Sequence, residues 1–203
     1  MKTYIALIRG INVIGRNSLP MKELVVLLEG VGARKIKTYI QSGNAVFQSA
    51  KNAPQLSAQL ADQIKKRCGF SPHVLILEVD AIEKAITQNP FPDAEKAPSS
   101  LHLGFLVSTP KSPDLKKLDT LRKASERFHL TNHVFYLHTP EGVGKSKLPA
   151  NAEKLLGVAM TYRNWRTVCK IRAMAGEQVF ARRPTHQPAG PARKAAQAGD
   201  FKR

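Results

Sequence analysis

Apolar and polar positions in the N-terminal half switch between strand-like and helix-like patterns. Continuous apolar, β-rich runs predict strands at residues 2–9, 35–41, 45–49 and 73–79. Apolar residues spaced three and four positions apart predict amphipathic helices at residues 20–30 and 54–68, with a shorter helix at 80–88. The resulting order, β-α-β-β-α-β, is typical of the split βαβ unit of ferredoxin-like folds.

The C-terminal half follows the same order of elements without a literal sequence repeat. Strands are predicted at residues 101–108, 127–130, 134–138 and 159–162, and helices at 114–125, 147–156 and 163–175. Residues 89–100 contain three prolines and predict a boundary between the halves. We therefore predict an α+β protein with two ferredoxin-like, mainly antiparallel halves at 1–88 and 101–176. A disordered basic tail is expected at 177–203.

The first predicted strand is apolar on both faces. Ile5 and Leu7 point to one face, and Tyr4, Ala6 and Ile8 point to the other. An antiparallel sheet with one face in water shows alternation of apolar and polar residues instead. We therefore expect the other half of the chain to cover the second face of this sheet.

The strong positive charge of the chain favours anionic partners. The 203 residues contain 32 Lys and Arg against 15 Asp and Glu, a formal net charge of +17. Residues 1–100 carry +5, residues 101–181 carry +7 and residues 182–203 carry +5, so the excess is not confined to the tail. A field of this size raises the local concentration of polyanions. The alternative interpretation is that the charge serves only solubility.

Membrane and secretory classes do not fit the sequence. No run of about 18 apolar residues occurs, and the apolar run near the N-terminus is too short for a signal peptide. Cys68 and Cys169 stand apart, which is typical of a reducing compartment rather than a disulfide framework. We expect a cytoplasmic protein with no membrane partner, and the sequence leaves its oligomeric state open.

Several short motifs stand out along the chain: RGINV at 9–13, TYIQSGNAVF at 38–47, NPF at 89–91, YL at 136–137, GKSKL at 144–148 and RNWRTV at 163–168. Together they resemble a bacterial family known as domain of unknown function 1697. The resemblance covers about residues 1–176 and implies a two-part α+β structure, with no established activity. The chain departs from the family at Ile14-Gly15, where the family usually has Gly-Gly, and at 159–162, where it favours a Thr-rich stretch.

Polar residues at the ends of the first-half elements are candidate anion ligands. Ser42 and Asn44 flank Gly43 in the predicted hairpin turn, where backbone N–H groups can face an anion. The alternative is a plain turn, because Gly and Asn adopt positive φ at low cost. Arg9, with Asn12 after it, can hold a phosphate or carboxylate through its guanidinium fork, or can bond the carbonyls of its own loop.

Lys145, Ser146 and Lys147 precede a predicted helix in the second half. The segment looks like a phosphate-binding loop, but Thr139 stands where that pattern needs its first glycine. Nucleotide hydrolysis is therefore not predicted. A looser anion site at the start of the helix is consistent with these three residues.

The last predicted helix carries a basic stripe. Arg163, Arg166 and Lys170 lie at positions i, i+3 and i+7 and so share one face, opposite Trp165. Such a stripe can lie along a nucleic-acid backbone, or can be the solvated face of a packed helix. Asn164 is a further candidate ligand, or it caps the helix and leaves Arg163 before it.

Motifs of metal and enzyme sites do not occur in the sequence. His129, His133 and His138 lack the acidic or cysteine neighbours of a closed metal site, so we predict no metal and no cofactor. A Ser/His/Asp order, a carboxylate pair and a dinucleotide fingerprint are likewise missing from the pattern. No catalytic residue is assigned, and whether the protein is an enzyme stays open.

Two functional hypotheses follow. The first is an anion-binding module with nucleic acid as the favoured polyanion. The second is an enzyme or binder of a small phosphorylated or carboxylated ligand in a cleft between the halves. That cleft would be lined by Arg9, Asn12, Ser42, Asn44, Ser146, Lys147, Arg163 and Asn164.

Overall fold

The computed structural model describes residues 1–13 and 15–180, with the backbone alone at 179 and 180. The predicted tail begins too early, because residues 177–180 belong to a helix, and the rest of it, from residue 181 on, lies outside the described residues. The first half contains β1 (Lys2–Arg9), α1 (Met21–Gly30), β2 (Arg34–Tyr39), β3 (Asn44–Ser49), α2 (Ala53–Cys68) and β4 (His73–Glu78). Its strands form an antiparallel sheet in the order β2-β3-β1-β4, which confirms the split βαβ prediction.

The second half has the same topology. It contains β5 (Leu101–Leu106), α4 (Leu115–Leu121), β6 (Arg127–Leu130), β7 (Val134–His138), η2 (Val143–Lys145), α5 (Leu148–Leu156) and β8 (Met160–Asn164). The strand order is β6-β7-β5-β8, again antiparallel. The predicted α+β class with two β-α-β halves is therefore confirmed.

One predicted helix in the second half is too long. The expected helix over 114–125 ends at Leu121, because the backbone of Arg122 turns to an extended conformation. A turn follows, in which the Lys123 amide donates to the carboxylate of Glu126 at 3.0 Å. Glu126 is almost fully buried, so this hydrogen bond competes successfully with the helix.

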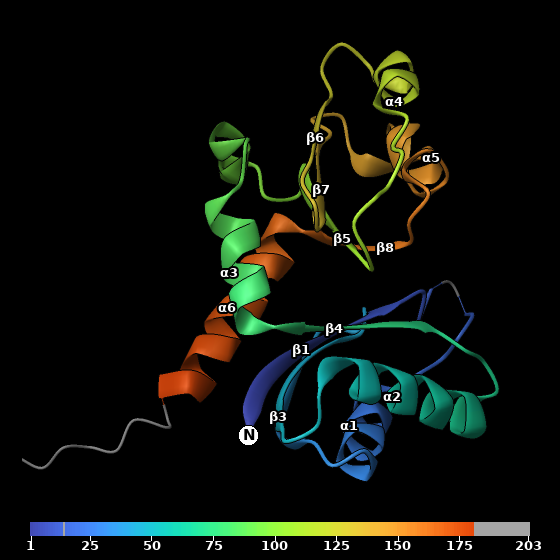
Figure 1. Ribbon diagram of the computed structural model, residues 1–203, viewed down its shortest axis with the longest axis vertical. Coiled ribbons are helices and arrows are strands. Elements are labelled where there is room, and N and C mark those ends of the chain that lie inside the picture. The colour runs from blue at the N-terminus through green and yellow to red at the C-terminus, as the bar shows by residue number, and fades with distance from the viewer. Residues whose placement is uncertain (14, 181–203) are drawn as a thin grey trace, which may run out of the picture.

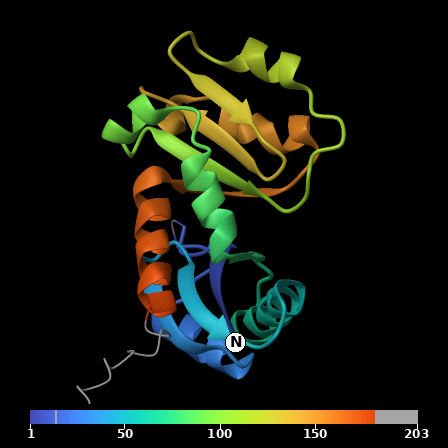
Figure 2. The ribbon, with the colours of Figure 1, turned by 60° about the vertical axis from the view of Figure 1, so that its left-hand side comes forward.

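Two helices lie between the sheets. After β4 the chain forms α3 (Val79–Thr87) and the short η1 (Pro92–Lys96), and after β8 it ends in α6 (Trp165–Phe180). Figures 1 and 2 show α3 and α6 side by side, spanning the space from one sheet to the other. The helix that ends the second half therefore runs along the sheet of the first half.

Three apolar clusters follow from this arrangement. The outer face of each sheet packs on its own helices, α1 and α2 in the first half and α4 and α5 in the second. The inner faces share one core with α3 and α6. That core includes Ile5, Leu7, Leu103, Phe105, Ile82, Trp165, Val168 and Ile171. The expectation that the second half covers the inner face of β1 is confirmed, with α6 as the covering element.

Arg127, the first residue of β6, anchors the segment around η1 to the second sheet. Its guanidinium pairs with Asp93 of η1 at 2.6 Å and lies 4.8 Å from the centre of the Phe91 ring. The same guanidinium donates to Nδ1 of His138 on β7, from Nε at 3.2 Å and from Nη2 at 3.0 Å. Since Arg127 has no acceptor, this geometry requires an unprotonated Nδ1 on His138.

We predict that the protein loses stability as the pH falls below neutrality. Burial and Arg127 lower the pKa of His138 below 6.5, and burial lowers the pKa of His102 as well. The unfolded chain then binds more protons than the folded one, so the free energy of unfolding falls as the pH drops below 6.5. Urea unfolding at pH 7, 6 and 5 measures this change.

The variant His138→Gln keeps an acceptor for Arg127 and removes the titrating group. We expect it to weaken the pH dependence between pH 7 and 5 while the effect of His102 remains. An identical pH dependence in the variant and the natural protein would contradict this assignment of His138.

Candidate functional site

The two halves meet at Arg163, which projects from the inner face of β8. Its Nε donates to Oδ1 of Asn44 at 2.5 Å, and its Nη2 donates to the carbonyls of Ile8 and Ser42, both at 2.8 Å. Its Nη1 donates to the carbonyl of Tyr162 at 2.8 Å. Arg163 therefore joins β8 to the end of β1 and to the β2–β3 hairpin through a single side chain.

The electrostatic setting of Arg163 is unusual for a partly buried cation. Among the described residues no carboxylate forms an ion pair with it, and burial lowers its pKa to about 10. The guanidinium therefore stays protonated at neutral pH, with carbonyl and amide dipoles as its partners. Removing such a donor would leave several acceptors without hydrogen bonds inside the protein.

The hairpin below Arg163 is held in one conformation. Asn44 is fully buried, and its Nδ2 donates to the Tyr39 carbonyl and to Oγ of Ser42, both at 3.0 Å. Gly43 has a φ of +78°, and a Cβ there would lie 2.9 Å from both Cβ and the carbonyl oxygen of Ile8. The turn thus needs glycine for its φ and for the close approach of β1.

Arg9 and Asn12 are also bonded within the protein. Nη1 of Arg9 pairs with Oε1 of Glu153 on α5 and lies 3.3 Å from the Met160 carbonyl. The same carboxylate oxygen accepts from the Met160 amide at 2.8 Å. Arg9 therefore makes a second link between the halves, beside that of Arg163.

Asn12 fastens the loop after β1, and its own φ is +54°. Its side chain donates to the carbonyls of Leu19, at 2.9 Å, and Gln41, at 2.8 Å, and accepts from the Leu19 amide at 2.8 Å. The loop is thereby tied both to the start of α1 and to the hairpin.

The structure corrects the predicted stripe on the last helix. Oδ1 of Asn164 accepts from the Thr167 amide at 2.9 Å, so Asn164 caps α6 and the helix begins at Trp165. Arg163 consequently lies in β8 and points into the junction rather than along the helix surface. Arg166 and Lys170 remain exposed on α6, one turn apart.

The predicted ligands at the start of α5 lie in a separate turn. Oγ of Ser146 accepts from the Leu148 amide at 3.1 Å, and the Lys147 carbonyl accepts from Asn151 at 2.8 Å. Lys145 ends η2, just before this turn. None of the described hydrogen bonds joins these residues to Arg9 or Arg163.

Among the first-half candidates, Asn44 and the Ser42 carbonyl accept hydrogen bonds from Arg163, whereas Arg9 pairs with Glu153 and Asn12 bonds to Leu19 and Gln41. All four are therefore bonded to protein groups. Two cavities lie away from Arg163, one between α3 and the β6–β7 turn and one beside Phe91. Sequence patterns could not find these, because residues from distant segments line them.

A further basic surface lies where α6 passes the free edge of β2. We call it the basic edge and define it as Arg34, Lys37, Arg166 and Lys170, all of which are exposed. Arg34 and Lys37 pair with Gln48 and Val46 of β3, whose side chains face α6, so they share that face. Nε2 of Gln178 donates to the Lys35 carbonyl at 2.7 Å and holds the end of α6 against β2.

Residues 1–136 match the family described as "Protein of unknown function (DUF1697)". The chain belongs to this family. This DUF1697 protein is also similar in structure to the conserved bacterial protein SP0830 from Streptococcus pneumoniae, with a TM-score of 0.62 and 24% sequence identity. The match covers 85% of this chain and 98% of the other, and at this identity it establishes the fold alone. Comparison with curated proteins gives no match.

Two further features of the described residues bear on the functional class of this DUF1697 protein. No helix within them is long and apolar enough to cross a membrane. Nor do they contain a group of three or more His, Cys, Asp or Glu side chains placed to hold a metal ion. Cys68 and Cys169 are both free and partly buried.

We predict that Arg163→Met destabilises the protein by about 3 kcal/mol, because several partly buried acceptors lose their donor. Urea unfolding measures the change in the free energy of unfolding. Arg166→Met is the matched control, since Arg166 is a neighbouring but exposed arginine and should change stability by about 0.5 kcal/mol or less. Equal effects of the two variants would contradict the role of Arg163.

Gly43→Ala tests the close approach of the hairpin to β1. Gly10 has a similar φ of +71° but nothing within 4 Å of a Cβ, so Gly10→Ala isolates the cost of the backbone conformation. We expect about 1 kcal/mol of destabilisation for Gly10→Ala and about 1–3 kcal/mol more for Gly43→Ala, by overpacking. Thermal or urea unfolding of both variants checks the difference, and its absence would rule out the clash.

Proposed function

We propose that this DUF1697 protein binds nucleic acid as a polyanion, through the basic edge where α6 passes β2. The observation that carries the proposal is the pair Arg166 and Lys170, which α6 displays one turn apart beside the cations of an edge strand. Two exposed elements with cations on one side suit the regular spacing of phosphates along a strand.

The charge balance of the described residues supports this choice. Residues 1–180 contain 26 Lys and Arg, of which nine form ion pairs with described carboxylates, so seventeen do not. Within the basic edge only Lys37 is paired, to Glu177 at 2.9 Å, and both groups are more than half exposed. Solvent screens such a pair strongly, so it contributes little and a phosphate can compete with it.

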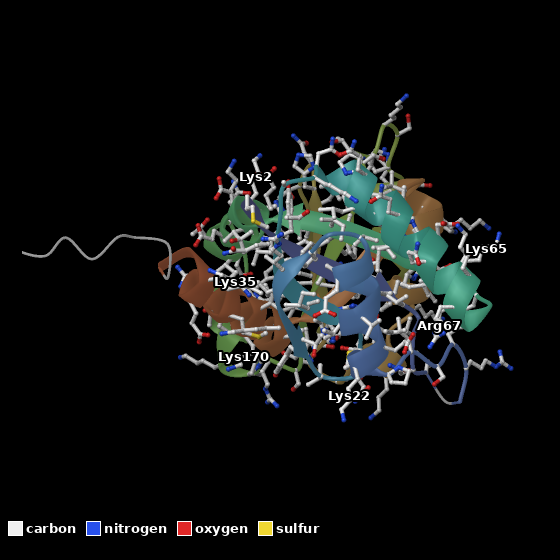
Figure 3. All side chains as sticks on the ribbon, turned by 90° about the horizontal axis from the view of Figure 1, so that it is seen from below. Lys2, Lys22, Lys35, Lys65, Arg67 and Lys170 are labelled. Carbon is white, nitrogen blue, oxygen red and sulfur yellow. The ribbon has the colours of Figure 1, made fainter. Side chains whose placement is uncertain are left out.

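The sequence that follows α6 adds further positive charge to the chain. In Figure 3, Lys35 and Lys170 lie on the side of the molecule where α6 ends. The sequence continues from this end into residues 182–203, which contain six Lys and Arg against one Asp. This positive charge adds to the net attraction of the chain for a polyanion.

The small-ligand hypothesis has less support. It requires the Arg163 fork to face a ligand, whereas that fork donates to the carbonyls of Ile8, Ser42 and Tyr162. In the basic edge, Arg34, Arg166 and Lys170 have no partner among the described side-chain hydrogen bonds and ion pairs, and the Lys37 pair is exposed. We therefore favour a polymeric anion on the surface over a small anion at the junction.

We predict that Arg166→Glu/Lys170→Glu weakens the binding of labelled single-stranded RNA or duplex DNA at least tenfold near 0.1 M salt. If both side chains contact phosphates, the slope of log K against log[salt] should also become shallower by roughly 2 on duplex DNA. Fluorescence anisotropy of the full chain across a salt series measures both quantities.

The matched control is Lys22→Glu/Lys65→Glu, which makes the same change in net charge on α1 and α2. Both lysines are exposed and have no described ion pair, and Figure 3 shows Lys65 on the opposite side of the molecule from Lys35 and Lys170. Screening at this salt limits their effect to about twofold. Equal losses in the two double variants would overturn the basic edge, and no binding at low salt would overturn the proposal itself.

A third variant replaces the Lys and Arg of residues 182–203 with Gln. If that change alone abolishes binding, the tail and not the basic edge is the binding element.

A further inference from the structure

A groove of about 880 Å³ opens between α3 and the β6–β7 turn, on a part of the surface that the basic edge does not reach. Both halves line it. Its apolar lining includes Ala85 of α3 with Phe105 and Val134 of the second sheet, all three buried members of the core that the two halves share. Pockets that bind small molecules commonly have this volume and lie between two structural units.

The walls of the groove are fixed by hydrogen bonds. The hydroxyl of Tyr136, on β7, donates to the Ala85 carbonyl at 2.9 Å and ties α3 to the second sheet. Oγ1 of Thr131 closes the β6–β7 turn through the amide and carbonyl of Val134, both at 3.1 Å. The Leu106 amide donates to the His133 carbonyl at 2.9 Å, which fastens the turn to β5. A ligand would therefore meet a preformed site, which lowers the entropic cost of binding.

The rim of the groove is polar but has little net charge. Lys84 and Asp80 face it from α3 with opposite charges, and Glu78 is paired with Lys2 at 2.8 Å. The groove thus lacks the excess of cations that a phosphate or carboxylate needs. Its charge balance favours a neutral ligand.

The other rim groups narrow the class of ligand. Gln88 and Asn132 each carry an amide, which can donate and accept hydrogen bonds together, as the edge of a nucleobase does. His129 and His133 add two imidazole rings, which stack on planar bases in nucleic-acid recognition. Amides and imidazoles beside an apolar lining match a flat ring that has polar atoms along its edge.

We infer that this groove binds a neutral planar heterocycle of the nucleoside class. The ring lies against the apolar lining formed by Ala85, Phe105 and Val134, and its polar edge bonds to Asn132 and Gln88. The inference goes beyond the proposed binding of polyanions, and it is independent of that proposal because a nucleoside carries no phosphate.

The test is a titration of the ¹⁵N-labelled full chain with adenosine, cytidine, uridine and inosine, each to about 5 mM, followed by amide NMR shifts. Because about 5 mM ligand exceeds a Kd of about 1 mM, even millimolar binding is detected. We expect at least one nucleoside to shift the amides of 81–88 and 131–134 in a saturable way, without shifting those of Arg166 and Lys170.

Two variants locate the binding. Ala81→Phe fills the groove and should weaken the affinity at least tenfold, whereas Ala58→Phe, on the exposed face of α2, should leave it unchanged. Asn132→Ala, in the exposed turn, should weaken the affinity at least threefold and serves if Ala81→Phe fails to fold.

Several results would overturn the inference. They are no shift with any of the four nucleosides, shifts confined to residues outside the groove, and groove shifts whose affinity is unchanged in both Ala81→Phe and Asn132→Ala. Binding of nucleic acid by the basic edge should be unchanged in Ala81→Phe, so the two proposals can fail separately.

Discussion

The arrangement of this protein depends on a partly buried guanidinium that has no described carboxylate partner. Arg163 leaves one sheet and donates to the carbonyls of Ile8 and Ser42 and to the side chain of Asn44 in the other. Carbonyl oxygens accept without bringing a charge of their own, so the arginine can be satisfied only where several converge. The end of β1 and the tight hairpin at Gly43 create that convergence. The relative position of the two halves is thereby set by main-chain geometry.

Two helices, each of which follows one sheet in the chain and contacts the other sheet, reinforce this junction. α3 follows the first sheet in the chain yet bonds through Ala85 to Tyr136 of the second, and α6 follows the second sheet yet packs along the first. Opening the halves would expose the core that they share, including Ile5, Phe105 and Trp165. Burial on this scale opposes a hinge motion. Candidate function therefore lies on surfaces that the rigid junction creates, at the edge of β2 and beside α3.

Much of the fold was predictable because it rests on local periodicity. Both β-α-β-β-α-β halves follow from apolar spacing, and the second apolar face of β1 predicted a covering layer. Errors arose where a single side chain decided the outcome. The carboxylate of Glu126 ends α4 early, and the cap by Asn164 moves Arg163 out of the helix. Spacing along a sequence carries no information about such partners, because each bond depends on where another segment lies.

The sequence by itself determined the elements, their order, the positive charge and the residues that converge near the first hairpin. It did not decide what these residues contact. Arg9, Ser42 and Asn44 have the chemistry of anion ligands, yet folding gives each of them a protein partner. The basic edge and the groove beside α3 likewise combine segments from distant parts of the chain. Periodicity reports which face of an element is buried, whereas the partner on that face is chosen only when the sheets and helices pack.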